Sequence, residues 1–113
     1  MFDNITSQVT IDGYSQATAS ANTLVMGDDA KLKIELDATN VSPALHLLGA
    51  GSGGSTIKGL AITHFASIGI FVYASSNNTI SGNFIGVNVE GTAISFVPGV
   101  GSNFPVDVEQ GSN

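Results

Sequence analysis

One four-residue pattern recurs at a regular spacing and constrains the fold of this chain more than any other feature. Thr-Ile-x-Gly occurs at residues 10–13, 56–59 and 79–82. The last two copies begin 23 residues apart, and the first two begin 46 apart, which is twice that step. Residues 33–36 (Lys-Ile-Glu-Leu) stand where an intervening copy belongs. One column of isoleucines then runs through the chain at a step of 23, formed by Ile11, Ile34, Ile57 and Ile80. A fixed period of this length indicates a repeat architecture.

A second apolar stretch follows the same step. Its two columns are Leu24, Leu47, Ile70 and Ala93, and Val25, Leu48, Phe71 and Ile94. Apolar residues alternate at period two in the second stretch, which is typical of a half-buried strand. Glycine, serine and asparagine clusters at 49–55 and 74–78 predict the corners between strands. Within one repeat, the residues expected to face inward are Ile57, Leu60 and Ile62, and then Ile68, Ile70 and Val72.

These patterns predict an all-β fold, a parallel β-helix (solenoid) of about four coils of 23 residues. Equivalent strands of successive coils would stack in parallel at about 4.8 Å. Their inward side chains would form a continuous core that no single coil can bury by itself. We expect coils at residues 9–31, 32–54, 55–77 and 78–100 within one domain over 1–100. Residues 101–113 break the repeat and are expected to be a C-terminal tail, cap or linker.

The repeats resemble those of a known group of proteins. Residues 56–62, Gly69-Ile70 and residues 80–86 are similar to parallel β-helix repeats of bacterial surface and secreted proteins in the pectate-lyase-like superfamily. The resemblance covers residues 9 to 94 and implies right-handed coiling, which agrees with the general preference for right-handed parallel crossovers. The superfamily contains lyases, hydrolases, adhesins and inert stalks, so the resemblance predicts a fold and does not select a function.

Composition excludes several classes of partner and compartment-specific chemistry. The formal charge is −6, with three lysines and no arginine, which argues against binding to nucleic acid or to an anionic membrane. No apolar run approaches the roughly 18 residues of a membrane span, so we expect no membrane insertion. The absence of cysteine excludes disulfides and thiolate metal sites.

The resemblance also sets a test for catalysis. Pectate-lyase-like enzymes use an arginine base beside acidic calcium ligands, and this chain contains no arginine. Polygalacturonase-like enzymes place several aspartates, a histidine and basic residues on one face. The adjacent acidic pair Asp28-Asp29 follows Gly27 and predicts a turn. We therefore expect no enzymatic activity and no catalytic residues.

The remaining polar candidates also have structural interpretations. Asp12, Glu35, Lys58 and Ser81 share the column beside the core isoleucines. This column predicts an exposed Glu35–Lys58 ion pair, or alternatively a calcium ion between Asp12 and Glu35. His46 is expected to point outward and His64 to occupy a partly covered corner, with neither binding metal. Residues 49–54 lack the Lys-Ser/Thr of a phosphate loop, so no cofactor site is expected.

Two further groups of side chains bear on function. Asn77, Asn78 and Asn83 are expected to bind backbone groups at the corners. The aromatic residues offer an alternative role as a stacking platform for sugars, with Tyr14, Phe65, Phe71 and Tyr73 as the candidates.

Both ends of a short solenoid expose strand edges and apolar core, which natural proteins cap, cover or pair. The leading hypothesis is therefore a non-catalytic, extracellular or cell-surface structural module. It is expected to form a homo-oligomer or homopolymer end to end, as a filament subunit or as part of a stalk or adhesin. The alternative is a carbohydrate-binding module with a polysaccharide partner, and a fragment of a polysaccharide lyase or hydrolase is the third hypothesis.

Overall fold

Three parallel sheets make up the described part of the chain, residues 3–92, 94 and 104–111 of the computed structural model. Helix is limited there to two single-turn 3-10 helices, η1 (Gly13–Ser15) and η2 (Ala50–Ser52). The first sheet contains β1 (Thr10–Asp12), β4 (Thr56–Lys58) and β7 (Thr79–Ser81). The second contains β2 (Ile34–Asp37), β5 (Leu60–Thr63) and β8 (Phe84–Ile85). The third contains β3 (Leu45–Leu48), β6 (Ile68–Tyr73) and β9 (Phe104–Glu109).

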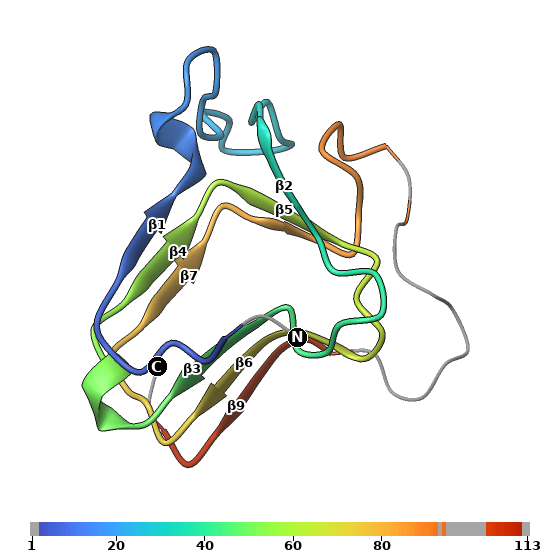
Figure 1. Ribbon diagram of the computed structural model, residues 1–113. Helices are drawn as coiled ribbons and strands as arrows, with labels where there is room; N and C mark the ends of the chain where they lie inside the picture. Colours follow the sequence, from blue (N-terminus) through green and yellow to red (C-terminus); the bar gives the residue numbers. More distant parts are fainter. Residues whose placement is uncertain (1–2, 93, 95–103, 112–113) are drawn as a thin grey trace.

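The chain visits the three sheets in turn, and each circuit adds one parallel strand to each sheet. Viewed along the stack, the sheets form the sides of a triangle (Figure 1). The predicted all-β class is confirmed, and the arrangement is consistent with a β-helix-like solenoid.

Aliphatic side chains from all three sheets meet inside the triangle. Ile57, Ile62, Ile70 and Val72 are fully buried there, and Leu60 is nearly so. These residues were predicted to face inward, and Ile68 from the same prediction is partly buried. The core therefore consists of stacked β-branched and leucine side chains, the residue types that suit a pleated, closely packed surface.

The predicted column of four isoleucines is only partly correct. Ile11, Ile57 and Ile80 do stand in register in the first sheet. Ile34 instead pairs with Leu60 in the second sheet, so the prediction of four coils at 9–31, 32–54, 55–77 and 78–100 is wrong. The described strands make three circuits, β1–β3, β4–β6 and β7–β9.

The physical reason is an excursion between β1 and β2. Residues 13–33 leave the sheets and lie outside the triangle (Figure 1). Leu24 and Val25, the predicted first members of the two columns in the second apolar stretch, lie in this excursion, where they and Met26 are exposed. The 46-residue step from Ile11 to Ile57 is thus one long circuit with a loop inserted, and not two short ones.

The third sheet has a different step from the one predicted. Leu45 pairs with Ile70 and Leu47 pairs with Val72, an offset of 25 residues rather than 23. Leu48 accordingly lies opposite Tyr73, not Phe71. The error is two residues, and a shift of two keeps every side chain on its own face of the sheet. Of the last members of these columns, Ile94 is exposed and Ala93 lies outside the described residues.

The predicted boundary at residue 100 is also wrong. Residues 101–113 were expected to be a tail, cap or linker outside the coils, but Phe104–Glu109 forms β9 and pairs in parallel with β6. The alternation of Phe104, Val106 and Val108 has the period of a strand, and this signal was hidden because it is out of step with the 23-residue repeat.

Polar side chains fix the corners between strands. Asn78 accepts a hydrogen bond from the Ser55 amide at 2.9 Å, and Ser52 donates to the Ser75 hydroxyl at 2.8 Å; both pairs are 23 residues apart. Asn83 accepts from the Leu60 amide and donates to the Ile57 carbonyl. The expected structural roles of Asn78 and Asn83 are confirmed, because each satisfies backbone groups that the turns leave unpaired.

The glycine of the Thr-Ile-x-Gly pattern has a steric explanation. Gly59 has a φ of +73°, and a Cβ there would lie 2.6 Å from the Tyr14 amide nitrogen. A Cβ on Gly13 would lie 2.0 Å from the Gly59 carbonyl oxygen. Stacked corners therefore require glycine at this position in successive circuits.

Substitution of Ile57 tests this core directly. We expect Ile57→Asp to abolish cooperative folding, because the change buries an unpaired charge between Ile11 and Ile80. The matched control is Lys58→Ser on the outward side of the same strand, which should change the free energy of unfolding by under about 1 kcal/mol. Circular dichroism with thermal melting measures both, and a cooperatively melting Ile57→Asp protein would contradict the register.

Candidate functional site

The outer face of the third sheet carries a row of aromatic side chains. His46 and Phe71 stand opposite each other on β3 and β6, with ring centroids 4.8 Å apart and an angle of 27° between the rings. Phe71 and Tyr73 lie two residues apart on β6, with centroids at 6.0 Å. All three alternate with inward residues and are partly buried. We call His46, Phe71 and Tyr73 the aromatic row.

Polar groups border the aromatic row on two sides. The Asn4 amide oxygen lies 3.1 Å from His46 Nδ1. On β9, Asp107 stands opposite Phe71 and Glu109 stands opposite Tyr73. The surface therefore combines ring faces that can stack with an amide and two carboxylates that can form hydrogen bonds.

Burial controls the charge state of the aromatic row. Desolvation lowers the pKa of His46 below its ordinary value of 6.5, because the partly buried ring is less well hydrated as a cation. His46 Nε2 is buried and has no hydrogen-bond partner within the described part of the chain. The His46 ring is thus mostly uncharged at neutral pH, which suits stacking against Phe71.

The structure selects among the aromatic residues named from sequence. Phe71 and Tyr73 come together as neighbours, whereas Phe65 is 1% exposed in the core and is not available to a ligand. Tyr14 lies by the first sheet, where its hydroxyl donates to the Gly82 carbonyl. Sequence reasoning missed His46 as a member of the row. The available signal was its position between Leu45 and Leu47, which placed it on the outer face.

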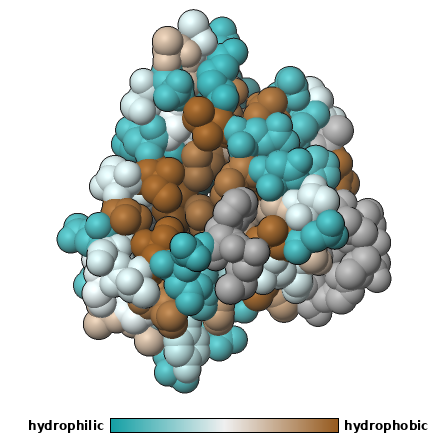
Figure 2. Space-filling model, viewed as in Figure 1, coloured by the Kyte–Doolittle hydropathy of each residue, from teal (hydrophilic) through white to brown (hydrophobic). Residues whose placement is uncertain are grey.

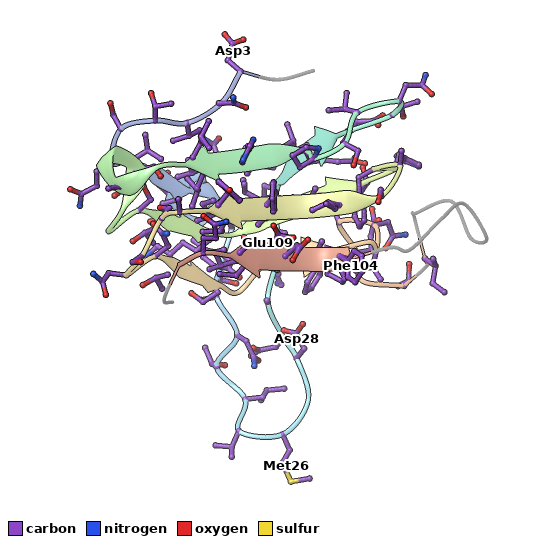
Figure 3. All side chains as sticks on the ribbon, turned by 90° about the horizontal axis from the view of Figure 1, so that it is seen from below. Asp3, Met26, Asp28, Phe104 and Glu109 are labelled. Carbon is purple, nitrogen blue, oxygen red and sulfur yellow. The ribbon has the colours of Figure 1, made fainter. Side chains whose placement is uncertain are left out.

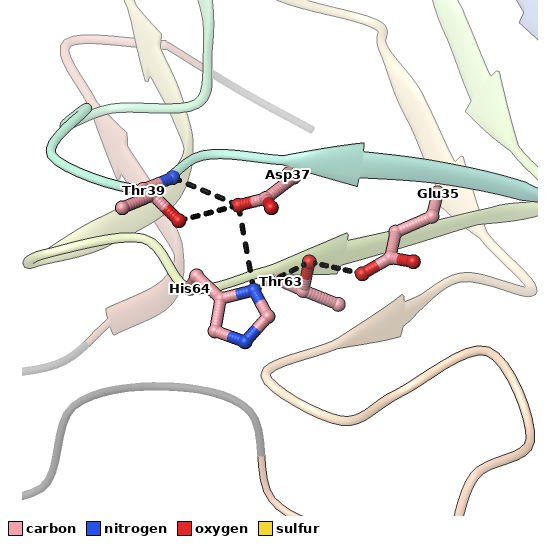
Figure 4. A network of polar contacts seen from close by, with 5 residues as sticks. All are labelled: Glu35, Asp37, Thr39, Thr63 and His64. Atoms are coloured by element: carbon pink, nitrogen blue, oxygen red, sulfur yellow. Dashed lines mark hydrogen bonds and ion pairs between the residues drawn. The ribbon is translucent and has the colours of Figure 1, made fainter.

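A polar network occupies the outer face of the second sheet (Figure 4). The Thr63 hydroxyl donates to Glu35 Oε1 at 2.7 Å. His64 Nδ1 lies 3.2 Å from Thr63 Oγ1 and 3.4 Å from Asp37 Oδ1. Thr39 donates to Asp37 from both its amide and its hydroxyl, and these hydrogen bonds lower the pKa of the Asp37 carboxyl.

This network does not have the geometry of a catalytic triad. A triad places the nucleophile and the carboxylate on opposite ring nitrogens of the histidine. Here both Thr63 and Asp37 face the same nitrogen of His64, and the Thr63 hydroxyl is buried and donates to Glu35. His64 itself is an exposed corner residue with a φ of +59°, so the network holds a turn in place.

The acidic column is rearranged relative to the prediction. Asp12, Lys58 and Ser81 do stand in register, but Glu35 belongs to the second sheet. The predicted Glu35–Lys58 pair is therefore wrong, and Lys58 instead lies 3.5 Å from Asp12. The alternative of calcium between Asp12 and Glu35 fails for the same reason. Within the described ranges, no three His, Asp or Glu side chains gather to hold a metal ion.

The remaining predicted corners have the expected character. Asp28 and Asp29 lie exposed in the excursion, where Asp28 accepts from the Ala30 amide and Asp29 from the Thr23 amide, as in a turn. Residues 49–54 contain η2 and form the corner between β3 and β4. Asn77 has a φ of +62°, a left-handed geometry that asparagine tolerates at a corner.

The two ends of the stack are the other unusual surfaces. At one end, the inward-facing side chains of β9 remain substantially exposed: Phe104 by 46%, Val106 by 37% and Val108 by 42%. At the opposite end, Ile11, Ile34 and Leu36 pack on the core yet are only partly buried. Figure 2 looks onto this second end and shows apolar residues gathered in a central hollow with polar residues around it.

Comparison with known proteins adds no relative. No protein-family profile, curated protein or solved structure matches the chain. Among the residues described, no helix has the length and apolar character needed to cross a membrane.

The aromatic row gives a testable titration. We expect the pKa of His46, measured by NMR, to lie below 6.5, and Phe71→Ala to move it back toward 6.5 because the ring regains water. Since the folded-state pKa is depressed, this group should make the protein less stable as the pH falls through 6.5 toward the folded value. A His46 pKa that is unchanged by Phe71→Ala would contradict the stacked geometry.

Proposed function

We propose that the chain is a non-catalytic structural module, a segment of right-handed parallel β-helix that associates end to end with further copies of itself. The observation that carries the proposal is the pair of open ends. Each end combines unpaired strand edges with exposed apolar side chains that face into the stack.

Unpaired strand edges and exposed apolar side chains both favour the binding of a partner at such ends. An exposed strand edge is a template for another strand, and β1, β2, β7 and β8 each have one edge that no described strand occupies. Exposed apolar patches of this kind mark interaction sites. The two ends differ, so their contact would be head to tail and would extend into a filament unless it closes into a ring.

The excursion adds apolar surface to one end. In Figure 3, the loop carrying Met26 and Asp28 projects past β9, on the side opposite Asp3. Leu24, Val25 and Met26 are exposed in this loop. It lies outside the triangle, so it would flank a second copy without blocking the sheets (Figure 1).

Charge and chemistry support the same role. Only 11% of the residues are charged, so little repulsion opposes association. The polar network around His64 lacks a triad arrangement, which supports the proposal that the module is not an enzyme. An extracellular or cell-surface location belongs with this role, because the repeats resemble those of surface and secreted proteins.

A charge placed at one open end tests the proposal. Val106→Lys should raise the protein concentration needed for assembly by about tenfold or more, since it buries an unpaired ammonium group at the contact. Ala50→Lys adds the same charge on exposed η2, at a side corner of the stack, and should leave assembly unchanged. Light scattering across a dilution series measures both, with circular dichroism as the check on folding. Equal effects of the two changes would contradict assembly through the ends.

The aromatic row supports a second candidate, binding of polysaccharide on the side of the stack. Stacked ring faces bordered by carboxylates suit the alternating apolar and hydroxyl faces of a sugar. This role is compatible with a structural module, because the row lies on the outer face and leaves both ends free.

Retention on immobilised polysaccharides tests this second role. Phe71→Ala and Tyr73→Ala should each weaken retention about tenfold, the loss expected for one stacking contact of about 1–1.5 kcal/mol. Phe104→Ala removes an exposed aromatic side chain from the end of the stack and serves as the control. No retention of the unmodified protein on any polymer would eliminate this candidate.

A further inference from the structure

One edge of the third sheet is already occupied by the start of the chain. Residues 3–9, the N-terminal strap, cross the free edge of β3 at Asn4 and Ile5 and then pass η2 to reach β4. The Ile5 amide donates to the His46 carbonyl at 2.8 Å, and the Leu48 amide donates to the Ile5 carbonyl at 2.9 Å. Ile5 thereby forms a parallel bridge with Leu47.

The register of the third sheet shows what else would fit this edge. Leu47 lies opposite Val72, and Val72 lies opposite Val108. If a second copy continued the sheet at the same offset, its Val108 would come opposite Leu47. Ile5 occupies that position.

The neighbouring residue repeats the match. His46 lies opposite Phe71, and Phe71 lies opposite Asp107. Continuation would therefore bring Asp107 of the second copy opposite His46, where the Asn4 side-chain oxygen now lies 3.1 Å from Nδ1. Asn4-Ile5 thus presents to β3 the same pair of groups as Asp107-Val108, a side-chain oxygen acceptor followed by a β-branched aliphatic residue.

The other two sheets carry no such obstacle in the described residues. The same continuation places Ile80 opposite Ile11 and Ile85 opposite Leu36, which joins apolar side chains at each position. The two ends are therefore complementary on two sides of the triangle and conflict on the third, where the strap and β9 require the same edge.

We infer that the N-terminal strap is an intramolecular competitor for β9 of a second copy, and that the free edge of β3 is the surface on which β9 docks. This inference rests on the proposed end-to-end association and names its contact. The strap makes two backbone hydrogen bonds to β3, whereas β9 pairs with four consecutive residues of β6 and would offer β3 the same length. Tethering gives the strap an effective concentration in the millimolar range, so it suppresses assembly of dilute protein.

A disulfide that locks the strap provides the test. The chain has no cysteine, so Asn4→Cys combined with His46→Cys creates a single pair at two side chains already in contact. The oxidised protein should remain monomeric at concentrations where the same protein, after reduction, assembles. Asn4→Cys alone is the matched control, and its assembly should be the same before and after reduction.

A release variant completes the experiment. Ile5→Asp places a carboxylate against the buried Leu47, so the strap should leave and assembly should begin at a concentration about tenfold lower than for the unmodified chain. If the oxidised and reduced proteins assemble equally, the inference about the strap is overturned and end-to-end association stands. If no variant assembles, Ile5→Asp included, while circular dichroism shows each to be folded, both proposals fall.

Discussion

The structure depends on one constraint, that each circuit must place its inward aliphatic side chains directly on those of the circuit before it. Ile11, Ile57 and Ile80 meet this condition in the first sheet, and Leu45, Ile70 and Val106 meet it in the third. Neither a single circuit nor a single sheet can bury its own apolar face. Glycine at the stacked corners lets the backbones of successive circuits approach each other. The side-chain amides of Asn78 and Asn83 form hydrogen bonds with backbone groups that the turns leave unpaired.

The sequence was sufficient for the middle of the molecule and misleading at its edges. The 23-residue step is real where circuits are short, as the Ser52–Ser75 and Ser55–Asn78 pairs show. The step failed where the chain inserts an excursion, because residues 13–33 are nearly as long as a circuit and hold apolar residues at the expected spacing. Two of the three residues of the aromatic row, Phe71 and Tyr73, were named from sequence, but His46 joins them only through the 25-residue offset of the third sheet. The register between strands of successive circuits depends on the lengths of the loops that join them, and periodicity alone does not give those lengths.

The same register is the basis of the proposed end-to-end association. The terminal strand of a stack always has one unpaired edge, so that edge must be covered by a cap or paired with a strand of a partner. Here the strap covers one sheet at one end, through Ile5, and no other described strand pairs with the remaining outer edges. The aromatic row lies on the side and is independent of this arrangement, which allows one module to assemble through its ends and bind a ligand on its face.

Hydrogen exchange measured at low and high protein concentration tests the central claim most directly, because backbone amides at unpaired edges gain protection only if another strand covers them. The account predicts that amides of β7, β8, β1 and β2 become protected as concentration rises, while those at the η2 corner do not change. Exchange that is independent of concentration, or new protection confined to the aromatic row, would contradict the claim that the ends of the stack are the functional surface.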